Sequence, residues 1–106
     1  MSDPSVKVVF CTLPNLEKAR QIGTVLVERQ LAACVNLIPK VESIYRWQGE
    51  VERADEVLAM IKTSASRYPG LESALTELHP YEVPEVIAFD VGAGLPEYLS
   101  WVAGEG

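Results

Sequence analysis

The chain has 106 residues, of which 48% are hydrophobic and 23% charged, a composition typical of a globular protein. Its formal net charge is −6 and its nine basic residues form no cluster, which argues against a phosphate-binding face for nucleic acid. The longest wholly apolar run, Val57 to Ile61, is far shorter than the roughly 20 residues that span a membrane. We therefore predict one domain over residues 1–106, with neither nucleic acid nor membrane as a partner.

The first ten residues, MSDPSVKVVF, lack the basic and long apolar regions of a signal peptide. The two cysteines, Cys11 and Cys34, are too few for a secreted disulfide framework and lack zinc-finger spacing. We expect a cytoplasmic protein with reduced thiols.

The first half of the chain predicts a strand, a helix and a hairpin. Residues 5–12 are apolar on both faces, as in a central strand. Asn15 suits the N-cap of a helix that ends near Arg29 or Gln30. Residues 31–47 and 50–62 form the two arms of a long hairpin with its turn at Gln48 and Gly49, and we expect a bulge where Pro39 interrupts the first arm.

The second half predicts a helix from about Pro69 to His79, a strand over residues 83–91 and a short final helix that begins at Pro96. The resulting β-α-β-β-α-β order, plus the small helix, indicates an α+β fold of the ferredoxin-like split βαβ type with an antiparallel sheet. Its third strand lies between the first and the second. Cys11 and Cys34 would then be about 9.6 Å apart, beyond the reach of a disulfide.

The hairpin is too long for its own domain. About 14 residues per arm at roughly 3.3 Å each give ~46 Å of strand, whereas a compact chain of this length has a diameter of ~33 Å. The half of the return arm nearest the turn is polar and acidic, and residues 57–61 are apolar. The overhanging half of the hairpin requires a partner to pack against, and another copy of the same chain is the simplest partner.

Catalytic signatures are absent from the sequence. There is no G-x-S-x-G, H-E-x-x-H, Walker A, C-x-x-C or G-x-G-x-x-G motif, and the one histidine is not accompanied by a serine in a distinctive context. We predict that the protein is not an enzyme.

Cys11 and His79 are the candidate metal ligands. A thiolate with an imidazole suits copper or zinc better than calcium or magnesium. One histidine and two distant cysteines cannot complete a tetrahedral zinc site in one chain, so a metal would be held loosely, with carboxylates, or between subunits. The alternative is that Cys11 is a buried core residue and that His79 interacts with the carbonyls at a helix end.

The segment from His79 to Glu85 combines a titratable ring, the Tyr81 phenol and two carboxylates in a connection stiffened by two prolines. Such a segment either lines a site or only fixes a turn. The other cleft candidates are Glu56 and Lys62 on the return arm, which an ordinary surface ion pair would equally explain, and Trp47, which could instead be a packing or interface anchor.

Five motifs in order closely resemble the CutA family of divalent-cation tolerance proteins. They are Leu31-Ala32-Ala33-Cys34-x-Asn36, Ser43-x-Tyr45-x-Trp47-x-Gly49, Glu56 with Lys62-Thr63, His79-Pro80-Tyr81-Glu82-x-Pro84-Glu85, and Tyr98-Leu99-x-Trp101. The resemblance covers nearly the whole chain. It implies a ferredoxin-like subunit in a tight homotrimer, an architecture shared with PII-type signalling proteins.

The resemblance also implies a role in tolerance to copper and other divalent cations, with Cys11 and His79 in the positions of copper ligands. Leu78 stands where some members have the first of two adjacent histidines. The resulting hypothesis is a trimer that loosely binds copper or a related divalent cation. The alternative is a PII-like regulatory or scaffolding trimer whose intersubunit cleft, with Glu56, Lys62, Tyr81 and Glu85, binds a small metabolite or a protein partner.

Overall fold

The computed structural model describes residues 5–105 and contains four strands and three helices within them. Their order is β1 (Val6–Leu13), α1 (Leu16–Glu28), β2 (Cys34–Trp47), β3 (Glu50–Ser64), α2 (Tyr68–Leu78), β4 (Ile87–Asp90) and α3 (Pro96–Glu105). All strand pairs are antiparallel and the sheet order is β2-β3-β1-β4. The split βαβ fold is confirmed, including the place of the third strand between the first and the second.

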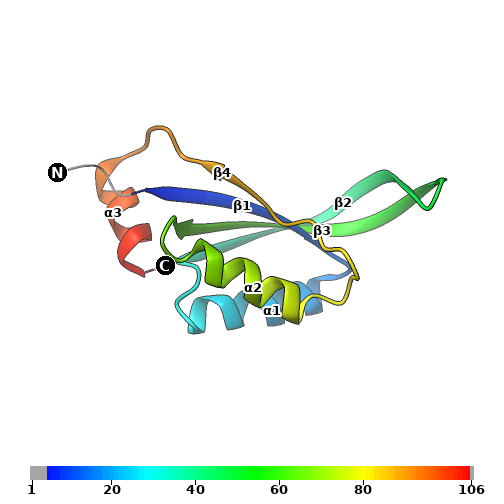
Figure 1. Cartoon of the computed structure of the whole chain (residues 1–106), viewed down its shortest axis with the longest axis horizontal. Coiled ribbons are helices and arrows are strands. Elements are labelled where there is room, and N and C mark those ends of the chain that lie inside the picture. Colours follow the sequence, from blue (N-terminus) through cyan, green and yellow to red (C-terminus); the bar gives the residue numbers. More distant parts are fainter. Residues whose placement is uncertain (1–4, 106) are drawn as a thin grey trace.

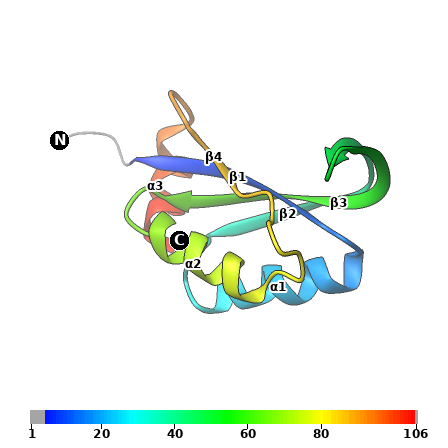
Figure 2. The same cartoon turned by 45° about the vertical axis from the view of Figure 1, so that its right-hand side comes forward.

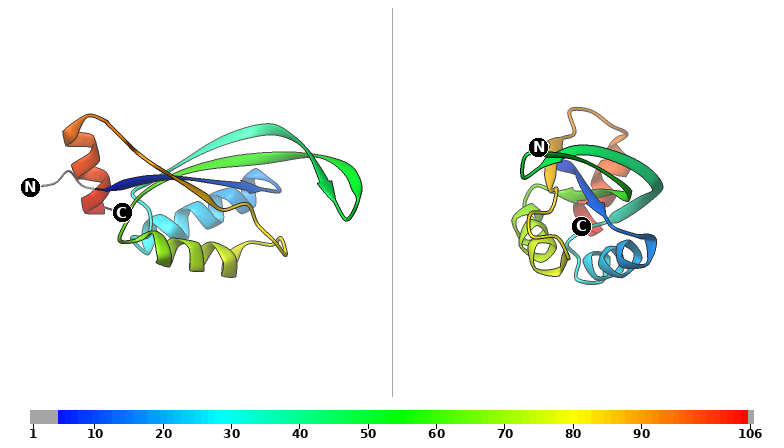
Figure 3. Two further views of the ribbon diagram at one scale, coloured as in Figure 1. Left: turned by 45° about the horizontal axis from the view of Figure 1, so that its top comes forward. Right: turned by 90° about the vertical axis from the view of Figure 1, so that its right-hand side faces the viewer.

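Helices α1 and α2 lie side by side under one face of the sheet (Figure 1 and Figure 3). Asn15 caps α1 as predicted, because its side-chain oxygen accepts a hydrogen bond from the Lys18 backbone amide at 2.8 Å. At Gly23, a Cβ atom would already contact the Val35 side chain at 3.4 Å, so glycine lets α1 lie close to β2. The core between helices and sheet contains buried side chains of β1 and β3 such as Val9, Leu13 and Ile61.

The opposite face of the sheet carries Asn36 and Lys62 together with a large apolar group, and it is only partly covered. The pairing register places on it a set of side chains from all four strands: Val8, Phe10, Ile38, Leu58, Met60, Ile87 and Phe89. We call this set the open face. Helix α3 packs only at one end of this side of the sheet, where Val102 is buried against Val6 and Ala33. Phe89 of the open face is still 49% exposed.

The hairpin formed by β2 and β3 projects beyond the rest of the domain (Figure 1), and its tip curls back (Figure 2). The molecule measures 50 × 26 × 22 Å along its principal axes, in line with the overhang that the strand lengths predict. The predicted bulge is also confirmed. The register shifts between Ile38 and Val41, and Lys40 has the left-handed φ of 62°.

One strand is shorter than predicted. Residues 83–91 were expected to form the last strand, but only Ile87–Asp90 pairs with β1. Pro84 has no amide to donate to a ladder. The pairing of β1 with β4 ends at Phe10. Two residues further along β1, the Thr12 carbonyl accepts a hydrogen bond from the His79 ring and not from the segment before β4. The segment before β4 therefore remains free to line a pocket.

Candidate functional site

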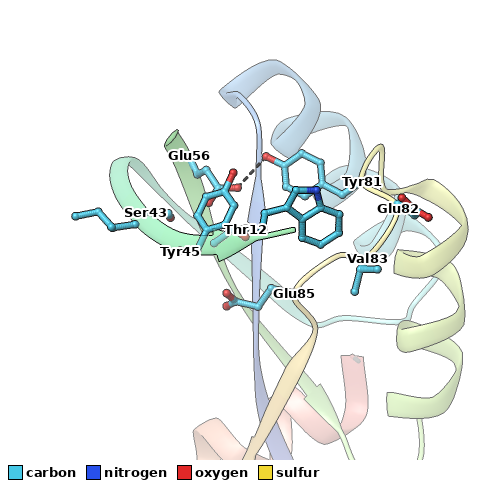
Figure 4. A pocket seen from close by; sticks show the side chains of 10 residues that line it. Thr12, Ser43, Tyr45, Glu56, Tyr81, Glu82, Val83 and Glu85 are labelled. Carbon is cyan, nitrogen blue, oxygen red and sulfur yellow. Dashed lines mark hydrogen bonds between the residues drawn. The ribbon is translucent and has the colours of Figure 1, made fainter. Parts of the chain in front are cut away.

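A pocket of about 570 Å³ lies where the curled hairpin faces the segment between α2 and β4 (Figure 4). Its lining residues come from β1, β2, β3 and that segment: Thr12, Ser43, Ile44, Tyr45, Trp47, Glu56, Tyr81, Glu82, Val83 and Glu85. We call it the acidic pocket, because three of these residues are glutamates and none is lysine, arginine or histidine.

Side chains alternate between the two faces of strand β2, and this alternation places Ser43, Tyr45 and Trp47 in the acidic pocket. Val41 pairs with Glu56 and Ser43 pairs with Ala54, so alternate residues of β2 share a face with Glu56. Tyr45 and Trp47 follow at the same two-residue spacing. The bulge at Pro39 and Lys40 comes directly before Val41, and it sets the register that brings this face of β2 opposite Glu56.

Glu56 is the deepest carboxylate of the pocket, with only 7% of its surface exposed. Its Oε2 accepts a hydrogen bond from the Tyr81 hydroxyl at 2.8 Å (Figure 4). Burial and this bond to a carboxylate raise the pKa of Tyr81 well above its ordinary value, so the phenol stays a donor at neutral pH. Within residues 5–105, Glu56 has no ion-pair partner.

His79 holds Tyr81 in place. The His79 Nε2–H donates to the Thr12 carbonyl at 2.7 Å, and Nδ1 accepts from the Tyr81 backbone amide at 3.1 Å. The two rings also contact each other, with their centroids 4.7 Å apart. His79 is the C-cap residue of α2, so the end of that helix is tied to β1. These bonds use both ring nitrogens.

Cys11 lies behind the acidic pocket and is not part of its lining. Its side chain is fully buried and its Sγ contacts the Thr12 carbonyl at 3.8 Å. Burial raises the pKa of the Cys11 thiol to about 12, and the negative charges of Glu85 and Glu56 add to the rise. The thiol is therefore protonated at neutral pH.

In the single chain, the two predicted metal ligands, Cys11 and His79, are both in other interactions. A ligand needs a free lone pair or a thiolate, whereas both nitrogens of His79 are bonded and Cys11 is a thiol. In the part of the chain that the structure describes, no group of three or more His, Cys, Asp or Glu side chains could hold a metal ion. The assignment of Cys11 and His79 as ligands stays a prediction.

Of the five predicted cleft residues, Trp47, Glu56, Tyr81 and Glu85 line the acidic pocket. Lys62 does not. It pairs with Val8 and Cys34 towards the other end of the sheet, and its Nζ donates to the Asn36 side chain.

Six residues of the pocket lining were not named as cleft candidates from the sequence: Thr12, Ser43, Ile44, Tyr45, Glu82 and Val83. Of these, Ser43, Tyr45 and Glu82 stand in the family motifs, and Glu82 is also one of the two carboxylates in the segment from His79 to Glu85. The alternation of Ser43, Tyr45 and Trp47 is a signal that could have found the β2 wall, because residues two apart on a strand share a face. No sequence signal near Thr12 indicates a role in the pocket, and only the fold of the chain brings this residue to it.

A family model described as CutA1 divalent ion tolerance protein matches residues 7–105. The chain belongs to this family. It is 52% identical over 98 residues to mouse protein CutA and 48% identical over 96 residues to the divalent-cation tolerance protein CutA of Thermus thermophilus. These matches cover 92% and 91% of the chain. They cover 55% of the mouse protein and 93% of the Thermus protein, so the chain spans about half the length of the animal relative.

Solved CutA structures have the same fold. That of the Thermus thermophilus protein superposes with a TM-score of 0.92 at 46% identity, covering 94% of this chain and 97% of that one. A protein from Nostoc, described as PII-like protein CutA, gives 0.88 at 44% identity, covering 93% and 95%. The names of the family and of these relatives describe cation tolerance or a PII-like protein, not a reaction.

The relatives are assigned to different compartments by name. An Arabidopsis relative is called chloroplastic and an Archaeoglobus fulgidus structure is called periplasmic. Among residues 5–105, none of the helices is long and apolar enough to span a membrane.

Proposed function

We propose that this CutA family member is a homotrimer that contributes to divalent-cation tolerance by binding cations in the acidic pocket. One observation carries the proposal: three glutamates line the pocket without a cationic side chain among its lining residues, and the most buried of them, Glu56, has no ion pair in residues 5–105. A buried carboxylate is costly unless a positive charge or hydrogen bonds compensate it. A bound cation would supply that charge.

The donor chemistry separates two classes of metal. The acidic pocket offers carboxylate and hydroxyl oxygens, which suit magnesium, calcium or manganese. Copper would prefer the sulfur of Cys11 and the imidazole of His79. For those two to bind copper, Cys11 must lose its proton and His79 must release Thr12 or Tyr81, so we expect copper to be held loosely.

Calorimetric titration of Mn²⁺ and Cu²⁺ into the full chain tests this proposal. For Mn²⁺ we expect binding that Glu56→Gln and Glu85→Gln each weaken. For Cu²⁺ we expect binding that Cys11→Ser and His79→Ala weaken. Glu77→Gln on α2 is the matched control, since it removes the same charge away from the pocket lining. Unchanged isotherms for the pocket variants would contradict binding at this site.

The assembly is supported by the two edges of the sheet and by its open face. Strands β2 and β4 are at opposite edges, so the outer edge of β2 in one copy can pair with the edge of β4 in the next copy. Such a head-to-tail contact closes into a ring when the rotation allows it. The open face, with Ile38, Ile87 and Phe89 each more than 40% exposed, would then be covered.

Light scattering tests the trimer. The expected mass is three times the 11.6 kDa of one chain. Ile87→Asp on the open face should lower that mass while far-UV circular dichroism stays unchanged, and Ser73→Asp on the outer side of α2 is the control for added charge. A wild-type monomer at micromolar concentration would contradict the proposal.

A second candidate is a PII-like module that binds a small metabolite or a protein partner. The size of the pocket favours it, because 570 Å³ lies in the range of small-molecule sites and far exceeds the space of one ion. A thermal-shift screen distinguishes the two, because a ligand that binds the folded state raises its apparent stability. We further propose a cytoplasmic location, which cell fractionation would test.

A further inference from the structure

The charge of the acidic pocket is spread along its walls. Glu56 projects from β3 at the base, whereas Glu82 and Glu85 belong to the segment before β4 and are exposed (Figure 4). No three acidic, cysteine or histidine side chains in residues 5–105 come together around one point that a metal ion could occupy. The pocket therefore presents separate anionic positions.

Aromatic and aliphatic surfaces lie between these positions. Tyr45 and Trp47 form the wall on β2, and Val83 lies on the opposite segment. Aromatic faces attract alkylammonium groups, and their area also favours contact with methylene groups. A small metal ion with its water shell would make no use of the Val83 surface.

We propose that the acidic pocket binds an aliphatic amine that carries two or more ammonium groups, a diamine or polyamine. One ammonium donates to the carboxylate of Glu56, at the oxygen that Tyr81 leaves free. A second ammonium lies near Glu85 at the mouth, and the methylene chain between them packs on Tyr45 and Trp47. The inference rests on the proposed cation-binding role of this pocket and specifies the kind of cation.

Three features of the structure fit a polyamine as well as a simple ion. The carboxylates are separated along the pocket, the wall between them is aromatic, and the volume of about 570 Å³ accommodates a chain of methylene groups. Lys62, the predicted cationic cleft residue, lies outside the lining. No lysine or arginine in the lining competes with the ligand for Glu56.

Tryptophan fluorescence tests the inference, because the chain has two tryptophans and only Trp47 lines the pocket. In a Trp101→Phe chain we expect spermidine to change the Trp47 emission in a saturable way. In the same background, Glu56→Gln should raise the dissociation constant at least about tenfold, since it removes a charge-assisted hydrogen bond. The glutamine can still accept the Tyr81 hydroxyl.

Controls separate a built site from diffuse attraction to an acidic chain. The uncharged analogue 1,4-butanediol should give no change, and Glu77→Gln should leave spermidine binding unchanged. The exposed Glu85→Gln serves as a second pocket variant if Glu56→Gln does not fold. Equal loss of affinity in the Glu77 variant and the pocket variants would overturn the inference.

Metals and amines are then titrated separately by calorimetry into the same full chain. Binding of Mn²⁺ without binding of spermidine would overturn this inference and leave the divalent-cation function standing. Spermidine binding that depends on Glu56, in the absence of Mn²⁺ and Cu²⁺ binding, would support the inference and overturn the divalent-cation function.

Discussion

The two halves of strand β3 have opposite environments. Residues 57–63 alternate between buried and half-buried positions and contribute Val57, Ala59 and Ile61 to the core. Residues 50–55 are exposed, except for the half-buried Ala54, although they pair just as regularly with β2. Strand pairing is therefore common to both halves, and only the inner half is stabilised by side-chain burial within this chain. Glu56 lies at the boundary, so the acidic pocket begins where the core ends.

The largest expected effect is in the inner half. Ile61→Ala should lower the free energy of unfolding by about 2–5 kcal/mol, because it removes a side chain that is 1% exposed and leaves a cavity between helices and sheet. Urea denaturation followed by circular dichroism measures it. Ile61→Val is the matched control and should cost about 0.5–1.5 kcal/mol. A loss below about 1 kcal/mol for Ile61→Ala would break the distinction between the halves.

Cys11, which pairs with Ala59 of the inner half, should make stability depend on pH. Its pKa is about 12 in the folded chain against an ordinary value of 9.0, so the folded state keeps the proton longer than the unfolded state. The buried thiol therefore contributes its full stabilisation to the folded state below pH 9, and this stabilisation is lost as the pH rises from about 9 to 12.

The Cys11→Ala chain should therefore lose stability less steeply over this range, by up to about 1.4 kcal/mol per pH unit. Urea denaturation at pH 8, 9 and 10 measures how steeply the free energy of unfolding falls with pH. Identical slopes for the wild type and Cys11→Ala would show that the folded thiol ionises normally.

The junction between the halves should give a smaller effect. Lys40 has a left-handed φ of 62° in the bulge, a conformation that glycine adopts without the steric cost of a Cβ atom. Lys40→Gly should raise the free energy of unfolding by up to about 1 kcal/mol, offset in part by the greater freedom of glycine in the unfolded chain. Lys40→Ala keeps the Cβ atom and should give no gain. A gain with alanine would mean that the lysine side chain itself is unfavourable there.

The smallest effect is expected in the outer half. Val51 is 70% exposed, so Val51→Ser should change the free energy of unfolding of a dissociated chain by less than about 0.5 kcal/mol. The measurement is made on the Ile87→Asp background, at a concentration where light scattering shows a monomer. If the same substitution costs more in the associated wild type, then the outer half is covered by a neighbouring copy.

Much of the fold could be predicted from local sequence signals. The cap at Asn15, the turn at Gln48 and Gly49, and the bulge at Pro39 each depend on backbone chemistry that acts within a few residues. The final strand was overestimated because apolar residues around Pro84 resemble a strand whether or not a partner is present. In the structure only Ile87–Asp90 pairs with β1, and the Thr12 carbonyl of β1 is bonded by His79.

The candidate site was predicted only in part. Trp47, Glu56, Tyr81 and Glu85 were named from family motifs and from chemistry, and the structure brings all four to one pocket. Lys62 was named on the same grounds, but its pairing with Cys34 directs it elsewhere. Position along a strand gives the face of a residue, whereas its distance from another segment depends on the register of the whole sheet.

Propensity, alternation and motif order can be read along the chain, so they specify the elements, the split βαβ order, the overhanging hairpin and the family. Three findings required the folded chain: Glu56 lacks an ion pair among the described residues, both nitrogens of His79 are bonded, and Cys11 is buried as a thiol. Charge compensation and burial depend on groups far apart in the chain, which only the folded sheet brings together.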